Sequence, residues 1–280
     1  MFITPTCSEE LLKLINLLDD KKSTDPYDIP VRLVKLSKNI ICTYLAAIFN
    51  NCVQNGIFPD KLKLAKIIPI FKSGAKDIAS NYRPISILSH FSKIFEKLMH
   101  KNLVSFLDTN NIITKHQFGF RSGLSTFLAL NQLHNYILRL NDSGQYTCGI
   151  FLDLKKAFDT VNHKILLDKL DNYGIRGLAL DFFTSYLKNR QQFVFANGVQ
   201  SDKMQITCGV PQGSTFGPVI FLLYINDLPL SSNSFCNIFA ADTALLISDT
   251  DPNNLEKKTN IEINRVFNWL QKNKLTKLSF

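Results

Sequence analysis

Two aspartates stand where apolar runs end or turn, and carboxylates in such positions can hold a metal ion. Asp153 follows the apolar residues IFL, and Asp242 lies within the run NIFAADTALLIS. Mg²⁺ takes oxygen ligands and usually keeps one or two protein carboxylates together with substrate phosphates. Two such ions can hold the attacking and leaving oxygens of a phosphoryl displacement. Because Ala241 stands where a second aspartate would suit that chemistry better, the pattern predicts a phosphoryl-transfer site that lacks one ligand.

The residues around both acids have the period of strands. Apolar residues occupy every second position over residues 146–152, which predicts a strand that ends at Asp153. Residues 235–247 predict a hairpin with positions 240–242 at its tip, so the two acids are expected at strand ends that adjoin. On its own, an Asp at the end of a strand is more often a turn residue or a helix cap. The presence of a second acid, Asp242, in a similar position favours a metal-binding role for both.

Helical periodicity accounts for much of the remaining chain. Helices are predicted over residues 40–54, 93–107, 124–140, 163–173 and 178–187, and around residues 261–270. A strand is predicted after Lys61, and a hairpin is predicted over residues 192–206 around Asn197-Gly198, a dipeptide typical of tight turns. No repeat or low-complexity linker marks a boundary. These elements predict a single α+β domain over residues 1–280, with helices packed on one face of a sheet.

Composition narrows the class of partner. The chain has 280 residues, of which 45% are hydrophobic and 22 are Phe, so a folded protein is expected. A formal net charge of +9 predicts a polyanionic partner, either nucleic acid or a membrane surface. The longest apolar run, Val219–Ile225, is too short to cross a bilayer, and the first residues show no secretion signal. We expect an intracellular protein of the nucleus or cytoplasm, with no membrane partner and six cysteines as free thiols.

Five segments then occur in a fixed order along the chain: NYRPISIL (81–88), QFGFRSGLST (117–126), FLDLKKAFDTV (151–161), GVPQGS to FLLYINDLP (209–229) and FAADTALL (239–246). Together they resemble the successive motifs of reverse transcriptases, specifically those of non-LTR, LINE-type retrotransposons. A group II intron maturase or a telomerase resembles the chain less, because YINDLP and NYRPIS are typical of the LINE-type branch. The resemblance implies an RNA-directed DNA polymerase with the right-hand fold, an α+β fold with fingers over residues 1–145 and palm over residues 146–280. The palm is expected to be an antiparallel sheet with helices packed on one face, and the thumb to be absent.

The same resemblance implies roles for residues of the acidic motifs. Asp153 and Asp242 resemble the catalytic carboxylates that hold two Mg²⁺ ions. Phe158 resembles the bulky residue that collides with a 2′-hydroxyl and so selects deoxynucleotides. An ordinary core aromatic would also explain Phe158, and the two roles are compatible. The family has a further aspartate at position 241, so the resemblance predicts a defective metal site in this copy.

Roles in substrate binding are implied for four more residues. Lys72 and Arg83 resemble residues that hold the triphosphate, since Arg offers a bidentate fork and Lys a mobile charge. Gln212 and Gly213 resemble the turn that lies against the incoming nucleotide and the template base. The neighbouring lysines of residues 61–76 are expected to be solvated or to contact a nucleic-acid backbone.

Two hypotheses remain open from the sequence. The first is an RNA-directed DNA polymerase that uses an RNA template, a DNA primer and deoxynucleoside triphosphates, impaired by Ala241. Loss of a direct metal ligand is expected to cost on the order of a thousandfold in rate. The second is a catalytically inactive, polymerase-like fragment that binds nucleic acid. The chain ends at KLTKLSF, before the thumb of its relatives, and lacks the upstream endonuclease, so a domain truncated at both ends is expected.

Overall fold

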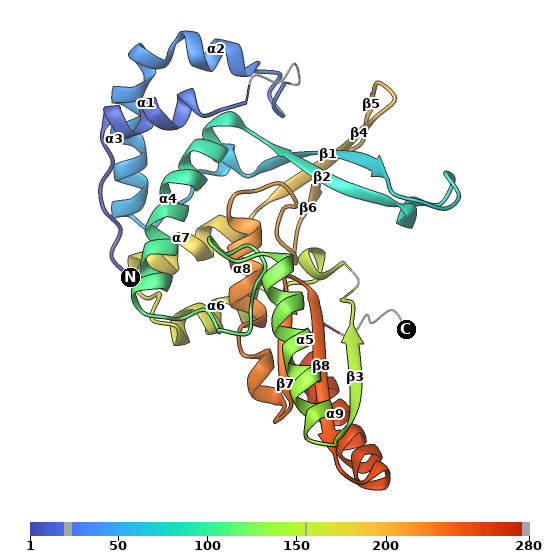
Figure 1. The fold of residues 1–280 in the computed structure, drawn as a ribbon. Coiled ribbons are helices and arrows are strands. Elements are labelled where there is room, and N and C mark those ends of the chain that lie inside the picture. The colour runs from blue at the N-terminus through green and yellow to red at the C-terminus, as the bar shows by residue number, and fades with distance from the viewer. Residues whose placement is uncertain (20–23, 155, 276–280) are drawn as a thin grey trace. The chain divides into compact units, whose positions relative to one another are not determined.

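The computed structural model describes residues 1–19, 24–154 and 156–275, and it combines helices with strands (Figure 1). The chain divides into two compact units, each built from two stretches of sequence. Unit 1 contains Met1–Asn110 and Leu167–Gly217, and unit 2 contains Asn111–Leu166 and Pro218–Phe280. The prediction of a missing thumb concerns the end of the chain, and residues 276–280 there lie outside the described residues. In the described part of the chain, no helix has the length and apolar character needed to cross a membrane.

The five helices predicted over residues 40–54, 93–107, 124–140, 163–173 and 178–187 are present, with ends shifted by no more than three residues. The last helix, predicted around residues 261–270, begins at Pro252, and the helices Val31–Leu36 and Phe216–Ile225 were not predicted. Unit 1 contains α1 (Ser8–Asn16), α2 (Val31–Leu36), α3 (Lys38–Gln54), α4 (His90–Thr109), α7 (Leu178–Leu187) and the short 3₁₀ turns η1 (Asp60–Leu62) and η2 (Ala79–Asn81). Unit 2 contains α5 (Thr126–Asp142), α9 (Pro252–Lys272), η3 (Ala157–Asp159) and η4 (Leu228–Ser231). Helices α6 (His163–Asn172) and α8 (Phe216–Ile225) each contain residues of both units.

Unit 1 contains a five-stranded sheet. Its strands are β1 (Leu64–Phe71), β2 (Tyr82–Leu88), β4 (Gln191–Ala196), β5 (Val199–Gln200) and β6 (Met204–Gln205), in the order β2-β1-β4-β5 with β6 paired to β4. The hairpin predicted at Asn197-Gly198 is present: both residues have positive φ, 51° and 79°, as a type I′ turn requires. Strands β1 and β4 pair in parallel, whereas the pairs β1–β2, β4–β5 and β4–β6 are antiparallel. Strand periodicity shows which side chains share a face and gives no direction, and the long connection between β1 and β4 permits parallel pairing.

The core of unit 1 is rich in stacked aromatic rings. Phe95 of α4 stacks on Phe49 of α3, with ring centroids 4.2 Å apart. Phe58 packs edge-on against Tyr186 of α7 at 5.0 Å. All four side chains are almost fully buried, so this cluster removes a large apolar area from water and joins α3, α4 and α7.

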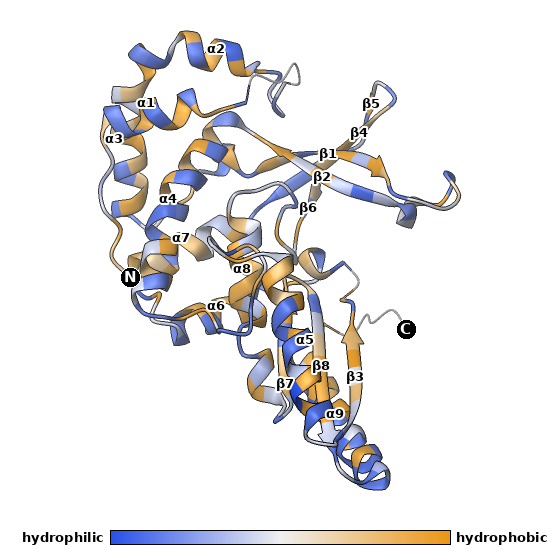
Figure 2. Ribbon diagram, viewed as in Figure 1, coloured by the Kyte–Doolittle hydropathy of each residue, from blue (hydrophilic) through white to orange (hydrophobic). Residues whose placement is uncertain are grey.

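Unit 2 contains a three-stranded antiparallel sheet in the order β3-β8-β7, formed by β3 (Tyr146–Leu152), β7 (Phe235–Phe239) and β8 (Asp242–Asp249). Residues 243–247 of β8 are all buried, so both faces of this central strand are covered. This differs from the prediction of helices on one face only. Helices α5 and α9 pack against the sheet. Figure 2 shows hydrophobic residues along β8, and both hydrophilic and hydrophobic residues on α9. The apolar run around Asp242 is therefore a buried strand rather than a half-exposed one.

Candidate active site

Asp153 and Asp242 lie at the same end of the unit 2 sheet. Strands β3 and β8 pair antiparallel, with Leu152 opposite Thr243, and the two aspartates are the next residues beyond that pair. Both are exposed. Partial burial and the negative charge of Asp153 raise the pKa of the Asp242 carboxyl above its ordinary value. The two carboxylates therefore repel one another, an arrangement that a bound cation would relieve.

The hairpin that carries Asp242 has a two-residue turn. Phe239 of β7 pairs with Asp242 of β8, so Ala240 and Ala241 form the turn and Asp242 begins the strand. Ala240 has a positive φ of 55°. Ala241 offers no ligand, and among the described residues no three His, Cys, Asp or Glu side chains gather as a metal site. Two carboxylates still fit a Mg²⁺ ion whose other ligands are water and substrate phosphates.

Phe158 belongs to an aromatic row in unit 2. It lies in η3 and is half-buried. Its ring stacks on Phe221 of α8, with centroids 4.7 Å apart, and meets Phe120 edge-on at 6.2 Å. These contacts give Phe158 the packing role of a core aromatic and hold its ring in one orientation, while part of it stays accessible.

Lys72 and Arg83 lie on one face of the ribbon formed by β1 and β2. Arg83 pairs with Ile70, and Lys72 follows Ile70 by two positions. The ladder extends past β1, because the Lys72 N–H donates to the Asn81 carbonyl at 2.9 Å. Side chains two positions apart on a strand share a face, as do directly paired ones. Both cations are exposed on that face, so the structure brings together the two residues assigned to a triphosphate.

The loop with Gln212 and Gly213 is joined to the same ribbon. The Ser86 N–H of β2 donates to the Gln212 carbonyl at 2.7 Å. Gly213 has a φ of 120°, and a Cβ there would lie 2.6 Å from the Ser86 carbonyl oxygen. Only glycine tolerates both conditions. The loop therefore approaches β2 as closely as backbone allows, three residues along the strand from Arg83.

A buried polar network holds this loop from its other side, and the sequence interpretation missed it. Glu96 of α4 is fully buried, and its carboxylate accepts hydrogen bonds from the Thr215 N–H at 2.7 Å and the Tyr186 hydroxyl at 3.1 Å. The guanidinium of buried Arg190 lies 4.6 Å from the Tyr186 ring centre. Burial raises the pKa of the Glu96 carboxyl, and the charge of Arg190 opposes that shift. A charged residue within the apolar stripe of α4, between Phe95 and Met99, was the available signal.

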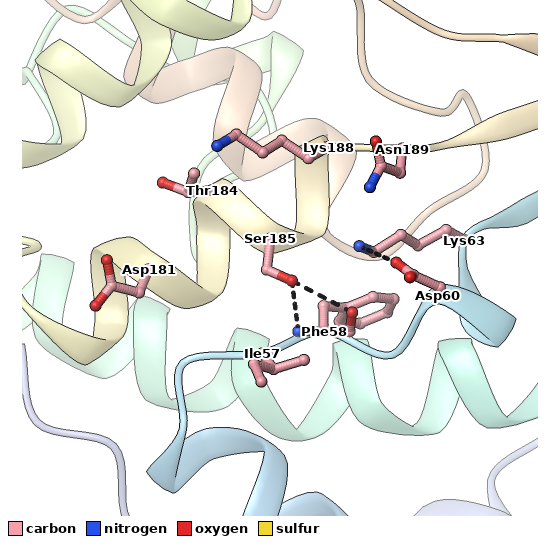
Figure 3. Close-up of a pocket in the computed structure, with 9 residues that line it drawn as sticks. All are labelled: Ile57, Phe58, Asp60, Lys63, Asp181, Thr184, Ser185, Lys188 and Asn189. Atoms are coloured by element: carbon pink, nitrogen blue, oxygen red, sulfur yellow. Dashed lines mark hydrogen bonds and ion pairs between the residues drawn. The ribbon is translucent and has the colours of Figure 1, made fainter.

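Unit 1 also has a surface hollow of about 360 Å³, bordered by α7 and η1 (Figure 3). Asp60 pairs with the Lys63 ammonium at 2.7 Å, and the Ser185 hydroxyl accepts a hydrogen bond from the Phe58 N–H at 3.0 Å. The lining contains two lysines and two aspartates, so its charges balance. No residue predicted for the active site lines this hollow.

The chain matches the reverse transcriptase (RNA-dependent DNA polymerase) family over residues 70–277, which is most of its length. The protein therefore belongs to the reverse transcriptase family. Among its relatives is a probable RNA-directed DNA polymerase from transposon BS of Drosophila melanogaster, 32% identical over 88% of this chain and 28% of the relative. The RNA-directed DNA polymerase from mobile element jockey of the same species is 35% identical over 79% of this chain and 24% of the relative.

A third relative, a probable RNA-directed DNA polymerase from transposon X-element, is 36% identical over 72% of this chain and 23% of its own length. The chain thus spans about a quarter of the length of these relatives. The prediction that it is a reverse transcriptase domain of the non-LTR retrotransposon type is confirmed.

Proposed function

We propose that this chain is the polymerase domain of a retrotransposon protein that copies RNA into DNA by metal-dependent nucleotidyl transfer. One observation carries the proposal: Asp153 and Asp242 adjoin at one end of the three-stranded sheet of unit 2, and the charge of Asp153 contributes to raising the pKa of Asp242. Such a pair in a reverse transcriptase is placed to hold Mg²⁺, which supplies electrostatic stabilisation to the oxygens of the transferring phosphoryl group. The substrates are an RNA template, a DNA primer and deoxynucleoside triphosphates.

The chain's own residues divide the remaining work. Lys72 and Arg83 bind the triphosphate as a mobile charge and a bidentate fork from one face of the ribbon. Gln212 and Gly213 form the surface on which the incoming base is placed, and the Ser86 backbone supports that surface. Phe158 excludes a 2′-hydroxyl with a ring fixed by its stacking on Phe221. The assignment of fingers to residues 1–145 and palm to residues 146–280 stays a prediction.

In this proposal, Ala241 impairs the catalytic activity of this copy. The position lies in the hairpin turn directly before Asp242, and its methyl group leaves the site with two carboxylates. The alternative is a catalytically inactive, polymerase-like fragment that still binds nucleic acid through its net charge of +9. The same feature, Ala241, favours this second function.

Primer extension by the purified 280-residue chain on an RNA template tests the proposal, with Asp153→Asn and Asp242→Asn as variants. We expect slow extension that both variants abolish, while RNA affinity stays unchanged and falls with salt for all three proteins. Salt-dependent RNA binding without extension by the wild-type chain supports the inactive fragment. Absence of RNA binding at low salt contradicts both functions.

A further inference from the structure

A short segment of unit 2, residues 116–119, lies beside the hairpin that carries Asp242. The Ile238 N–H donates to the His116 carbonyl, and the Phe118 N–H donates to the Ile238 carbonyl, both at 2.8 Å. These bonds add residues 116–118 to the outer side of β7 as a parallel extension of the sheet. The segment belongs to the motif QFGFRSGLST, and its glutamine has no role in the function proposed above.

Gln117 directs its side chain to the turn of that hairpin. It is 2% exposed, and its Oε1 accepts hydrogen bonds from the Ala240 N–H at 2.9 Å and the Gly119 N–H at 2.7 Å. Its Nε2 donates to the Ala240 carbonyl at 3.3 Å. A primary amide accepts through its oxygen and donates through its NH₂ group at the same time, whereas an ionised carboxylate only accepts. One side chain therefore satisfies both backbone groups of Ala240.

The turn requires such support because of its conformation. Ala240 has a φ of 55°, in a region that side chains other than glycine rarely adopt. Gly119 packs directly on it: a Cβ at position 119 would lie 2.3 Å from the Ala240 nitrogen. Gln117 and Gly119 thus hold an unfavourable backbone conformation that a free Ala-Ala turn would leave.

We propose that Gln117 is a positioning residue that fixes the direction in which the hairpin presents the Asp242 carboxylate. Asp242 follows the clamped residue by two positions and begins β8, so a change at Ala240 turns the carboxylate relative to Asp153. The inference rests on the proposed function, in which these carboxylates hold a metal ion. A glutamine with a merely structural role would stabilise the unit without influencing metal affinity.

Gln132 offers a matched control. It lies on α5, and its Oε1 accepts a hydrogen bond from the Asn237 side chain of β7 at 3.0 Å. Gln132→Leu therefore removes a glutamine bond to the same hairpin without touching its turn. Gln117→Leu is the same substitution, and it removes the two hydrogen bonds to Ala240 and the one to Gly119.

Two measurements on the full chain test the inference: hydrogen exchange of the Ala240 amide, and affinity for Mn²⁺ as the probe. For Gln117→Leu we expect exchange about tenfold faster or more, since a net hydrogen bond accounts for roughly that factor. Affinity for Mn²⁺ should fall about 10–100-fold, the usual effect of losing a group that orients a ligand. Gln132→Leu should change neither quantity.

Unchanged amide exchange or unchanged Mn²⁺ affinity in folded Gln117→Leu overturns the inference, as does an equal response from Gln132→Leu. If Gln117→Leu does not fold, Gln117→Asn, which withdraws the amide by one methylene, decides by the same measurements. Asp242→Asn tests the metal site separately. If that variant binds Mn²⁺ as the wild type does, the proposed metal site is wrong, and amide exchange still decides whether Gln117 holds the turn.

Discussion

The loop around Gln212 in unit 1 and the hairpin turn at Ala240 in unit 2 are held in the same manner by different chemistry. Each is a backbone segment bound by one buried side chain that is distant in sequence. A carboxylate, Glu96, accepts from the Thr215 N–H next to the loop, whereas an amide, Gln117, bonds to both backbone groups of Ala240. One support is ionisable and the other is neutral.

This difference sets how each region responds to pH. Burial raises the pKa of Glu96, so its folded-state pKa is higher than its unfolded-state pKa. Its contribution to stability is present below the unfolded-state pKa and is lost as pH rises through the folded-state value. Gln117 does not titrate. In unit 2 the pH-dependent group is instead the presented carboxylate, Asp242. In unit 1 the side chain that holds the loop, Glu96, responds to pH. In unit 2 the carboxylate that follows the turn, Asp242, responds to pH.

The largest expected effect concerns the missing acid in unit 2. Ala241→Asp adds a carboxylate beside Asp242 and should tighten Mn²⁺ binding while raising any primer-extension rate by orders of magnitude, on the order of a thousandfold. Metal titration and extension on an RNA template measure both. Asp153→Ala in the same variant should return extension to background. A folded Ala241→Asp protein no better than its parent would show that the defect lies elsewhere.

Removal of the ionisable support in unit 1 should have the next largest effect. Glu96→Ala removes the acceptor of the Thr215 and Tyr186 hydrogen bonds and the negative charge that interacts with buried Arg190. The variant is expected to lower the free energy of unfolding by about 3–5 kcal/mol. Glu96→Gln is the control: its amide oxygen can accept from Thr215 and its NH₂ can donate to the Tyr186 hydroxyl. Chemical denaturation as a function of pH should show the Glu96-dependent slope in wild type and its loss in Glu96→Gln. An equal slope in both proteins would remove Glu96 as the source.

The basic face of the unit 1 ribbon should give a smaller effect that is specific to nucleotide. Arg83→Gln and Lys72→Gln are each expected to weaken deoxynucleoside triphosphate binding about 10–100-fold, the range for hydrogen bonds to charged groups. RNA affinity should change less, because the electrostatic free energy of RNA binding is shared among many cationic side chains. Lys76→Gln, an exposed lysine near the same ribbon, is the control, and an equal loss there would mean that only net charge matters.

The smallest effect is a shift in the titration of unit 2. Asp153→Asn removes the negative charge beside Asp242 and should lower the pKa of Asp242, leaving only the part due to burial. Because the raised pKa means that ionised Asp242 destabilises the fold, wild-type unit 2 should lose stability as pH rises through that pKa, and the variant should lose less. NMR titration of the Asp242 carboxyl checks the shift. An unchanged pKa would show that the two acids do not interact.

The sequence predicted the family and the places of most elements. The strand ending at Asp153, the hairpin before Asp242 and the Asn197-Gly198 turn depend on periodicity and turn chemistry within a few residues, so they are readable from the chain alone. That Lys72 and Arg83 share one face depends on the pairing of β1 with β2, which was not predicted from the sequence. The parallel partner of β1 was not readable, because alternation carries no information on strand direction.

By itself, then, the sequence determined the reverse transcriptase family and the order of its motifs, in which Asp153, Ala241 and Asp242 stand, since these depend on residue type and order. Only the tertiary structure showed which side chains hold the loop at Gln212 and the turn at Ala240. Glu96 meets Thr215 across 119 positions, and Gln117 meets Ala240 across 123. Contacts at such separations arise from the packing of whole elements, and no local pattern encodes them. For this reason a buried glutamate and a motif glutamine became interpretable only once the helices and the hairpin were in place.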